Sequence, residues 1–166
     1  MNFMAVAKSL ELPLATETWI ATALLHRENP DRADFSIQEI VARARSEKLA
    51  GTLRSGVQVH ASTHCVANRE PKPAQLRMLY ATGKRTRRLF REGDDAHPKR
   101  HGKITPDPET IPPQYRYLLE WYANEYSKPH EEAWLKGIFE MAGAGKKAFA
   151  GVDPDEYVRQ LRQDWD

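Results

Sequence analysis

Apolar residues recur at helical spacing in the first third of the chain. Over 16–28, Trp19, Ile20, Ala23 and Leu24 repeat at intervals of one, three and four positions. This spacing is typical of one face of an amphipathic helix. The Asn-Pro-Asp sequence that follows predicts the end of this helix.

A second helix is predicted to begin at Ser36, a residue type favoured at helix N-caps. Glu39, three positions later, is placed as its capping-box partner, and Phe35 is placed to pack on Ile40 as a hydrophobic staple. Gly51 ends this helix or follows its end. The apolar positions again follow helical spacing: Ile37, Ile40, Val41 and Ala44.

A third helix is predicted over 55–67, where Val57, Ala61 and Cys65 are four positions apart and define one buried stripe. Its β-branched residues lower its intrinsic helix propensity. Its remaining faces are more polar and carry Gln58, Ser62 and Thr63.

Alternating apolar and polar residues over 76–91 predict two strands. The Thr-Gly-Lys sequence at 82–84 has the composition of a turn. The segment is therefore a β-hairpin with a basic tip, and Leu89 faces the side of its strand opposite to Arg88 and Phe90.

The rest of the chain reads as a linker followed by helices. Residues 94–112 are rich in proline, glycine and charge, and they predict an extended linker. Helices are predicted after Pro113, over 130–142 and from Asp153 onward, where Asp153 is the N-cap. The first of these helices carries an apolar and aromatic stripe: Tyr115, Leu118, Leu119, Tyr122 and Tyr126.

Composition fits a folded protein. The 166 residues are 40% hydrophobic, which is enough for one full core. No window resembles a membrane span or a secretory signal, and Cys65 is the single cysteine. We therefore expect a cytoplasmic protein with no membrane association.

Charge is distributed unevenly. Residues 1–68 have seven basic and seven acidic residues, 69–103 have eleven basic against four acidic, and 104–166 have seven basic against twelve acidic. A basic middle of this kind indicates a polyanionic partner, although a solvated basic surface without a ligand has the same composition.

Candidate chemistry is sparse. His60 and His64 have the spacing of two metal ligands on a helix, but no third ligand completes a motif. Cys65 and His64 are adjacent on the helix and do not face each other as a nucleophile and base would. The neighbouring acids Asp94 and Asp95 resemble part of a nuclease site but lie in a loop without an organising element. We expect no metal, no cofactor and no enzymatic activity.

Three helices followed by a basic hairpin form the arrangement of a winged helix-turn-helix. The stretch from Val57 to Asp95 resembles an uncharacterised prokaryotic winged-helix family, through His60, Ala67, Asn68, Gly83, Arg87, Leu89, Phe90 and Arg91. The resemblance implies a winged helix-turn-helix over 14–93. Together with the linker predicted over 94–112 and a helical extension over 113–166, this gives an α+β, mostly α fold. The resemblance also implies contact with double-stranded DNA, as expected for a transcriptional regulator. A homodimer is a further expectation, because winged helices often bind paired half-sites. The residues expected to contact base edges are Gln58, Ser62 and Thr63 of the third helix. Those expected to contact phosphates are Arg54, just before that helix, and Lys84, Arg85, Arg87 and Arg88 of the hairpin.

The C-terminal segment is similar to the toxin-binding tails of small bacterial antitoxins. The similarity lies in Asp153, Tyr157, Val158, Arg159, Leu161, Arg162 and Trp165. It implies an autoregulating, antitoxin-like component of a two-gene module, whose protein partner binds Tyr157, Val158, Leu161 and Trp165. The alternatives are that this helix packs on its own domain, or that the chain is an adaptor that binds a toxin or enzyme without reading DNA.

Overall fold

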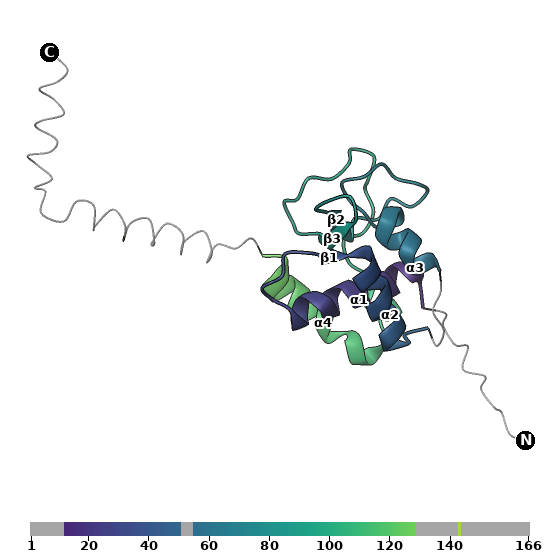
Figure 1. The fold of residues 1–166 in the computed structure, drawn as a ribbon, viewed down its shortest axis with the longest axis vertical. Helices are drawn as coiled ribbons and strands as arrows, with labels where there is room; N and C mark the ends of the chain where they lie inside the picture. Colours follow the sequence, from purple (N-terminus) through teal and green to yellow (C-terminus); the bar gives the residue numbers. More distant parts are fainter. Residues whose placement is uncertain (1–11, 51–54, 129–142, 144–166) are drawn as a thin grey trace, which may run out of the picture. The chain divides into compact units, whose positions relative to one another are not determined.

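The computed structural model describes residues 12–50, 55–128 and 143 (Figure 1). The chain divides into two units between Pro129 and His130, and the described residues 12–128 all belong to the first. The helices predicted over 130–142 and from Asp153 onward lie outside the described residues. In the described ranges the fold is α+β and mostly helical, with one three-stranded antiparallel sheet. No helix there is both long and apolar enough to cross a bilayer.

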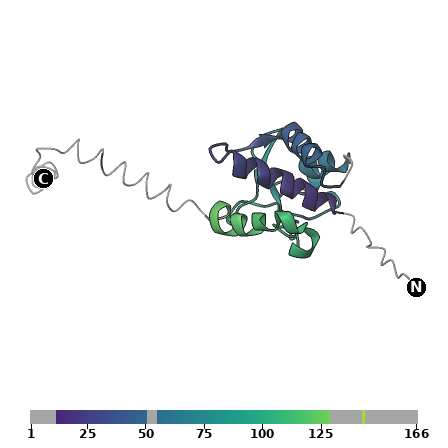
Figure 2. The ribbon, with the colours of Figure 1, turned by 90° about the horizontal axis from the view of Figure 1, so that it is seen from below.

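The first helix, α1 (Leu14–Glu28), is the centre of the core. Its predicted apolar residues are buried, and Trp19 and Ile20 have no solvent exposure. The helix is buried almost all round because α2 lies on one side of it and α4 on the other (Figure 2). The hydroxyls of Thr18 and Thr22 are satisfied inside this packing, since they donate to the carbonyls of Leu14 and Thr18.

The second helix, α2 (Ile37–Glu47), begins with the predicted capping box. Ser36 Oγ accepts from the Glu39 backbone N–H at 3.1 Å, and Glu39 Oε2 accepts from the Ser36 N–H at 2.8 Å. Arg32 adds an ion pair to Glu39 at 2.7 Å. The helix ends at Lys48, which adopts a left-handed conformation with φ 51°. It therefore ends before Gly51, which is outside the described residues.

The third helix consists of α3 (Gly56–Val59) and a π-helical turn, η1 (His60–His64). The predicted stripe of Val57, Ala61 and Cys65 is completely buried. The helix ends at His64, three residues before the predicted end, where the Cys65 N–H donates to the carbonyl of His60. We refer to residues 56–64 as the α3–η1 helix.

The predicted hairpin is present as β2 (Leu79–Ala81) and β3 (Thr86–Leu89), which pair antiparallel with Leu79 opposite Leu89. A third strand, β1 (Phe35–Ser36), was not predicted. It pairs with the outer edge of β3 and gives the sheet order β1-β3-β2. Two residues are too few to show an alternating pattern, so only the tertiary contact reveals this strand.

Residues 94–112 differ from the predicted linker because they pack against the first 93 residues. The His97 N–H donates to Ala67 O, and the Gly102 N–H donates to Gln75 O at 2.9 Å. Any side chain at position 102 would collide with this backbone, because a Cβ there would lie 2.4 Å from Gln75 O. The segment contains a short 3₁₀ turn, η2 (Pro108–Thr110), and the buried Ile111. It is part of the core unit and does not separate two domains.

The helical region after Pro113 completes the core. It consists of a 3₁₀ turn, η3 (Pro113–Tyr115), then α4 (Tyr117–Trp121) and a π-helical turn, η4 (Tyr122–Tyr126). The predicted stripe is confirmed, since Leu118, Tyr122 and Tyr126 are buried. The Tyr122 hydroxyl donates to the carbonyl of Phe90, and its ring meets Trp19 edge-on at 5.8 Å.

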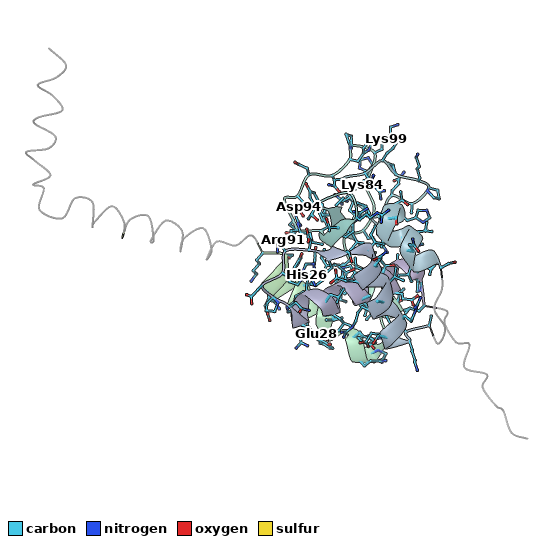
Figure 3. The ribbon with its side chains drawn as sticks, in the orientation of Figure 1. His26, Glu28, Lys84, Arg91, Asp94 and Lys99 are labelled. Carbon is cyan, nitrogen blue, oxygen red and sulfur yellow. The ribbon has the colours of Figure 1, made fainter. Side chains whose placement is uncertain are left out.

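One buried histidine joins three elements of this core. The ring of His26, on α1, packs against the rings of Phe35 and Tyr126, each with its centroid 4.9 Å away (Figure 3). The Leu89 N–H points at His26 Nε2 at 3.4 Å, so this nitrogen acts as an acceptor. Burial, and secondarily the positive charges of Arg91 and Arg88, lower the pKa of His26 from 6.5 to about 3. The folded protein therefore keeps this imidazole neutral.

His26 should make stability fall in mild acid. Its folded pKa lies below its unfolded pKa, so its contribution is complete above pH 6.5 and is lost as pH falls toward 3. Between pH 7.5 and pH 5 we expect it to remove about 2 kcal/mol of unfolding free energy. Urea unfolding of the wild type and of His26→Gln, which keeps an acceptor but does not titrate, measures the difference. Equal pH dependence in the two proteins would contradict this expectation.

Candidate nucleic-acid interface

A groove of about 450 Å³ lies between the start of α2, the α3–η1 helix and the hairpin tip. Gln38 and Gln58 contribute amide groups, and Lys84 and Arg85 contribute cations from the tip (Lys84 is labelled in Figure 3). We call this the basic groove. It is lined by Ser36, Ile37, Gln38, Gln58, Ser62, Arg69, Lys84, Arg85 and Arg87.

The three polar residues expected on the third helix lie on its outward side. Gln58 is exposed, and Ser62 and Thr63 are half-buried. Ser62 Oγ donates to Gln58 O at 2.7 Å, and Thr63 Oγ1 donates to Val59 O at 3.1 Å. Because each hydroxyl proton is used within the helix, each oxygen meets a ligand as an acceptor.

The tip cations are the most available of the four basic hairpin residues expected to contact DNA. Lys84 and Arg85 are exposed, and neither forms an ion pair with another residue in the described ranges. Arg69 stands beside them, with its guanidinium donating to Lys84 O at 3.3 Å. The groove thus brings together cations from two separate loops. Arg54, also expected to bind DNA, lies outside the described residues.

The Arg88 side chain is engaged by neighbouring residues of the hairpin and of the turn that follows it. Its guanidinium donates to both carboxylate oxygens of Asp94, at 2.6 and 2.8 Å, and lies 4.4 Å from the centre of the Tyr80 ring. Asp94 Oδ2 also accepts from the Arg91 N–H, which closes the turn after β3. We therefore assign Arg88 to the hairpin's structure and not to phosphate contact.

Arg87 is buried beneath the groove, with no exposed surface. Its Nε donates to Ala61 O at 2.9 Å and its Nη2 to Ser62 O at 3.3 Å, while Nη1 donates to Thr86 O and Gly83 O. A phosphate contact would require these bonds to break. Arg87 is therefore better explained as a support for the α3–η1 helix than as the DNA contact expected from its basic character.

A second buried arginine, Arg100, completes the same support from the segment predicted to be a linker. It is 2% exposed, and its Nη2 donates to Thr63 O at 2.7 Å and its Nη1 to His64 O at 2.9 Å. The same guanidinium donates to the carbonyls of Arg69 and Leu76, both at 2.6 Å. Together, Arg87 and Arg100 satisfy the carbonyls of the last four residues of the α3–η1 helix, 61–64, which helix geometry leaves without i+4 partners.

Burial weakens the protonation of both arginines without removing it. Desolvation, with a smaller contribution from Arg69, lowers the pKa of Arg87 to about 10, and desolvation also lowers the pKa of Arg100. Both remain positively charged at neutral pH. A positive charge at the C-terminal end of a helix also interacts favourably with the helix dipole.

The hairpin is joined to the helix by backbone pairing as well. Cys65 O accepts from the N–H groups of Met78 and Leu79, and the Asn68 side chain forms two bonds of 2.9 Å with the backbone of Ala81. The tip cations are consequently held in a defined position relative to the outward side of the α3–η1 helix.

Sequence reasoning missed Gln38, Arg69 and Arg100. The basic composition of 69–103 included both arginines but did not distinguish their roles. Gln38 follows a helix N-cap and lacks a sequence signal of its own, because its place in the groove arises when α2 meets the α3–η1 helix. Burial of Arg100 was hidden by its proline- and glycine-rich surroundings.

In the described ranges, no further residues complete the metal site or the nucleophilic site considered for His60, His64 and Cys65. The rings of His60 and His64 lie 4.7 Å apart, but no cluster of three His, Cys, Asp or Glu residues surrounds them or any other described position. Burial raises the pKa of the Cys65 thiol to about 12, so the thiolate is scarce at neutral pH. Tyr157, Val158, Leu161 and Trp165, the expected partner-binding residues, lie outside the described residues.

Comparison of the chain with protein-family models, with curated protein sequences and with solved structures gives no match.

Loss of Arg100 should strongly destabilise the fold. We expect Arg100→Ala to lower the unfolding free energy by at least about 3 kcal/mol, because several buried carbonyls lose their donor. Arg100→Lys should fall between this variant and the wild type, since an ammonium cannot reproduce the planar fork of donors. Chemical denaturation measures both.

The neighbouring Lys99 provides the matched control. Its side chain is exposed (Figure 3), so Lys99→Ala should change stability by no more than about 0.5 kcal/mol. If Arg100→Ala were as stable as Lys99→Ala, the buried guanidinium would not be what satisfies the helix end.

Proposed function

We propose that this protein binds double-stranded DNA in a sequence-dependent manner, as a transcriptional regulator with a winged helix-turn-helix. In this proposal the α3–η1 helix enters the major groove and the hairpin tip contacts phosphates. The order of elements supports it: α1, β1, α2, α3–η1, β2 and β3, with the sheet order β1-β3-β2. This is the order in which a winged helix-turn-helix places its helices and its hairpin.

The observation that carries the proposal is the basic groove itself. The outward side of the α3–η1 helix offers an exposed amide and two hydroxyl acceptors, and exposed cations stand beside it at the hairpin tip. Base edges in the major groove are read by amides and hydroxyls, whereas phosphates are bound by lysine and arginine. The two kinds of group are adjacent here, and their spacing is set by the buried arginines.

Neutralising the hairpin tip should weaken DNA binding in a salt-dependent manner. Lys84→Ala/Arg85→Ala removes two proposed phosphate contacts, so the slope of log K against log salt concentration should become shallower by about 2. Affinity should fall by a similar factor for different duplex sequences, because phosphate contacts carry no base information. Fluorescence anisotropy with a labelled duplex over a range of salt concentrations measures both quantities.

Arg116 and Lys128 offer a control of equal charge. Both are exposed, and they flank the α4–η4 region, on the side of α1 opposite to α2 (Figure 2). Arg116→Ala/Lys128→Ala should leave the salt slope close to that of the wild type. Absence of duplex binding by the wild type at low salt would refute the proposal. Equal salt slopes for the two double variants would show that Lys84 and Arg85 do not contact phosphates.

A further inference from the structure

Two large apolar side chains are strongly exposed among the described residues, Val59 at 45% and Tyr117 at 40%. Tyr117 is partly accounted for, because the Arg27 guanidinium lies 4.7 Å from the centre of its ring. Val59 projects from the α3–η1 helix, next to Gln58. A β-branched residue at an exposed helical position lowers helix propensity and gains less packing in return than a buried one would. Fold stability therefore gives little reason for a valine at this position.

The position of Val59 places it among the proposed base-reading groups. Val59, Ser62 and Thr63 have the i, i+3 and i+4 spacing of neighbours on one helix face. The stripe of Val57 and Ala61 is on the buried side of the same helix. An isopropyl group therefore stands beside two hydroxyl acceptors on the outward face.

The major groove contains one apolar group that matches such a side chain. Among the four bases only thymine presents a methyl group there, at C5, while adenine presents the N6 donor and N7 acceptor that a glutamine amide pairs with. The acceptor oxygens of Ser62 and Thr63 suit exocyclic amines, including adenine N6.

We propose that Val59 reads thymine, with its isopropyl group packed on the C5 methyl and with Gln58 on an adenine of the same or an adjacent base pair. This inference rests on the proposed DNA-binding function and specifies its ligand: a duplex half-site with an A·T pair at the centre of the α3–η1 contact. Charge complementarity favours DNA over an apolar protein partner, since the exposed cations Lys84 and Arg85 border the groove beside this face.

The test begins with the whole 166-residue chain and a pool of random-sequence duplexes. After selection of bound duplexes, each thymine of the enriched site is replaced singly by uracil, which keeps the pairing edge and lacks only the methyl group. For the wild type, one replacement should weaken binding about threefold to fivefold, as expected for one buried methyl group. In Val59→Ala the same replacement should have no effect, because the contact is already absent.

Two controls separate the thymine contact from general damage. Tyr117→Ser alters the other strongly exposed apolar residue and should retain the wild-type response to uracil. Thermal unfolding of Val59→Ala should match the wild type, because the replaced side chain is exposed and alanine favours helix.

The outcomes distinguish this inference from the function it rests on. If no duplex is enriched and none binds at low salt, DNA binding itself is refuted and the thymine contact with it. If a site is enriched but no uracil replacement weakens the wild type, or if Val59→Ala responds to uracil as the wild type does, DNA binding stands and the assignment of Val59 is overturned.

Discussion

The structure depends on hydrogen bonds from two arginine side chains to the backbone carbonyls at the C-terminal end of the α3–η1 helix. The carbonyls of residues 61–64 have no i+4 partners, and apart from Thr63 O, which also accepts from the Val66 N–H at 3.3 Å, they depend on side chains for donors. Arg87 donates to the first two and Arg100 to the last two. A carbonyl without a donor and a buried guanidinium without acceptors are each unfavourable. The hydrogen bonds between them remove both costs. The contact therefore joins three segments that are distant in sequence: the helix, β3 and the chain near residue 100.

The same contact prepares the proposed interface. Arg87 and Arg100 bind the C-terminal end of the α3–η1 helix on its buried side, so Gln58, Val59 and Ser62 remain on its outward side. The hairpin is attached through Asn68 and Cys65, so Lys84 and Arg85 at its tip stay close to that side. Readout of base edges requires groups held in a defined geometry, and rigid neighbouring elements provide it. The basic residues of the hairpin thus divide into structural supports, the buried Arg87 and the paired Arg88, and exposed cations at the tip, Lys84 and Arg85, that are available to the proposed ligand.

Much of the local structure was predictable because its causes are local. The capping box of Ser36 and Glu39 depends on residues three apart, and the buried stripe of Val57, Ala61 and Cys65 depends on helical periodicity. The alternation in the hairpin and the aromatic stripe that ends at Tyr126 were also predictable from the spacing of nearby residues. β1 was missed because two residues show no period. The proline- and glycine-rich stretch looked like a linker because its order comes from hydrogen bonds to distant backbone, such as that of Gly102 to Gln75.

The sequence alone was enough to predict the helices found in the described residues, the hairpin, the concentration of positive charge in the middle of the chain and the polar residues on the third helix's exposed side. Which of those charges are available to a ligand depends on the folded chain. Strand alternation placed Arg87 and Arg88 on opposite faces, but it could not say which carbonyls or carboxylates would meet them. Arg87 is buried, Arg88 is paired with Asp94, and Lys84 and Arg85 remain exposed. A guanidinium's role depends on the acceptors around it, and folding brings those acceptors together from distant parts of the chain.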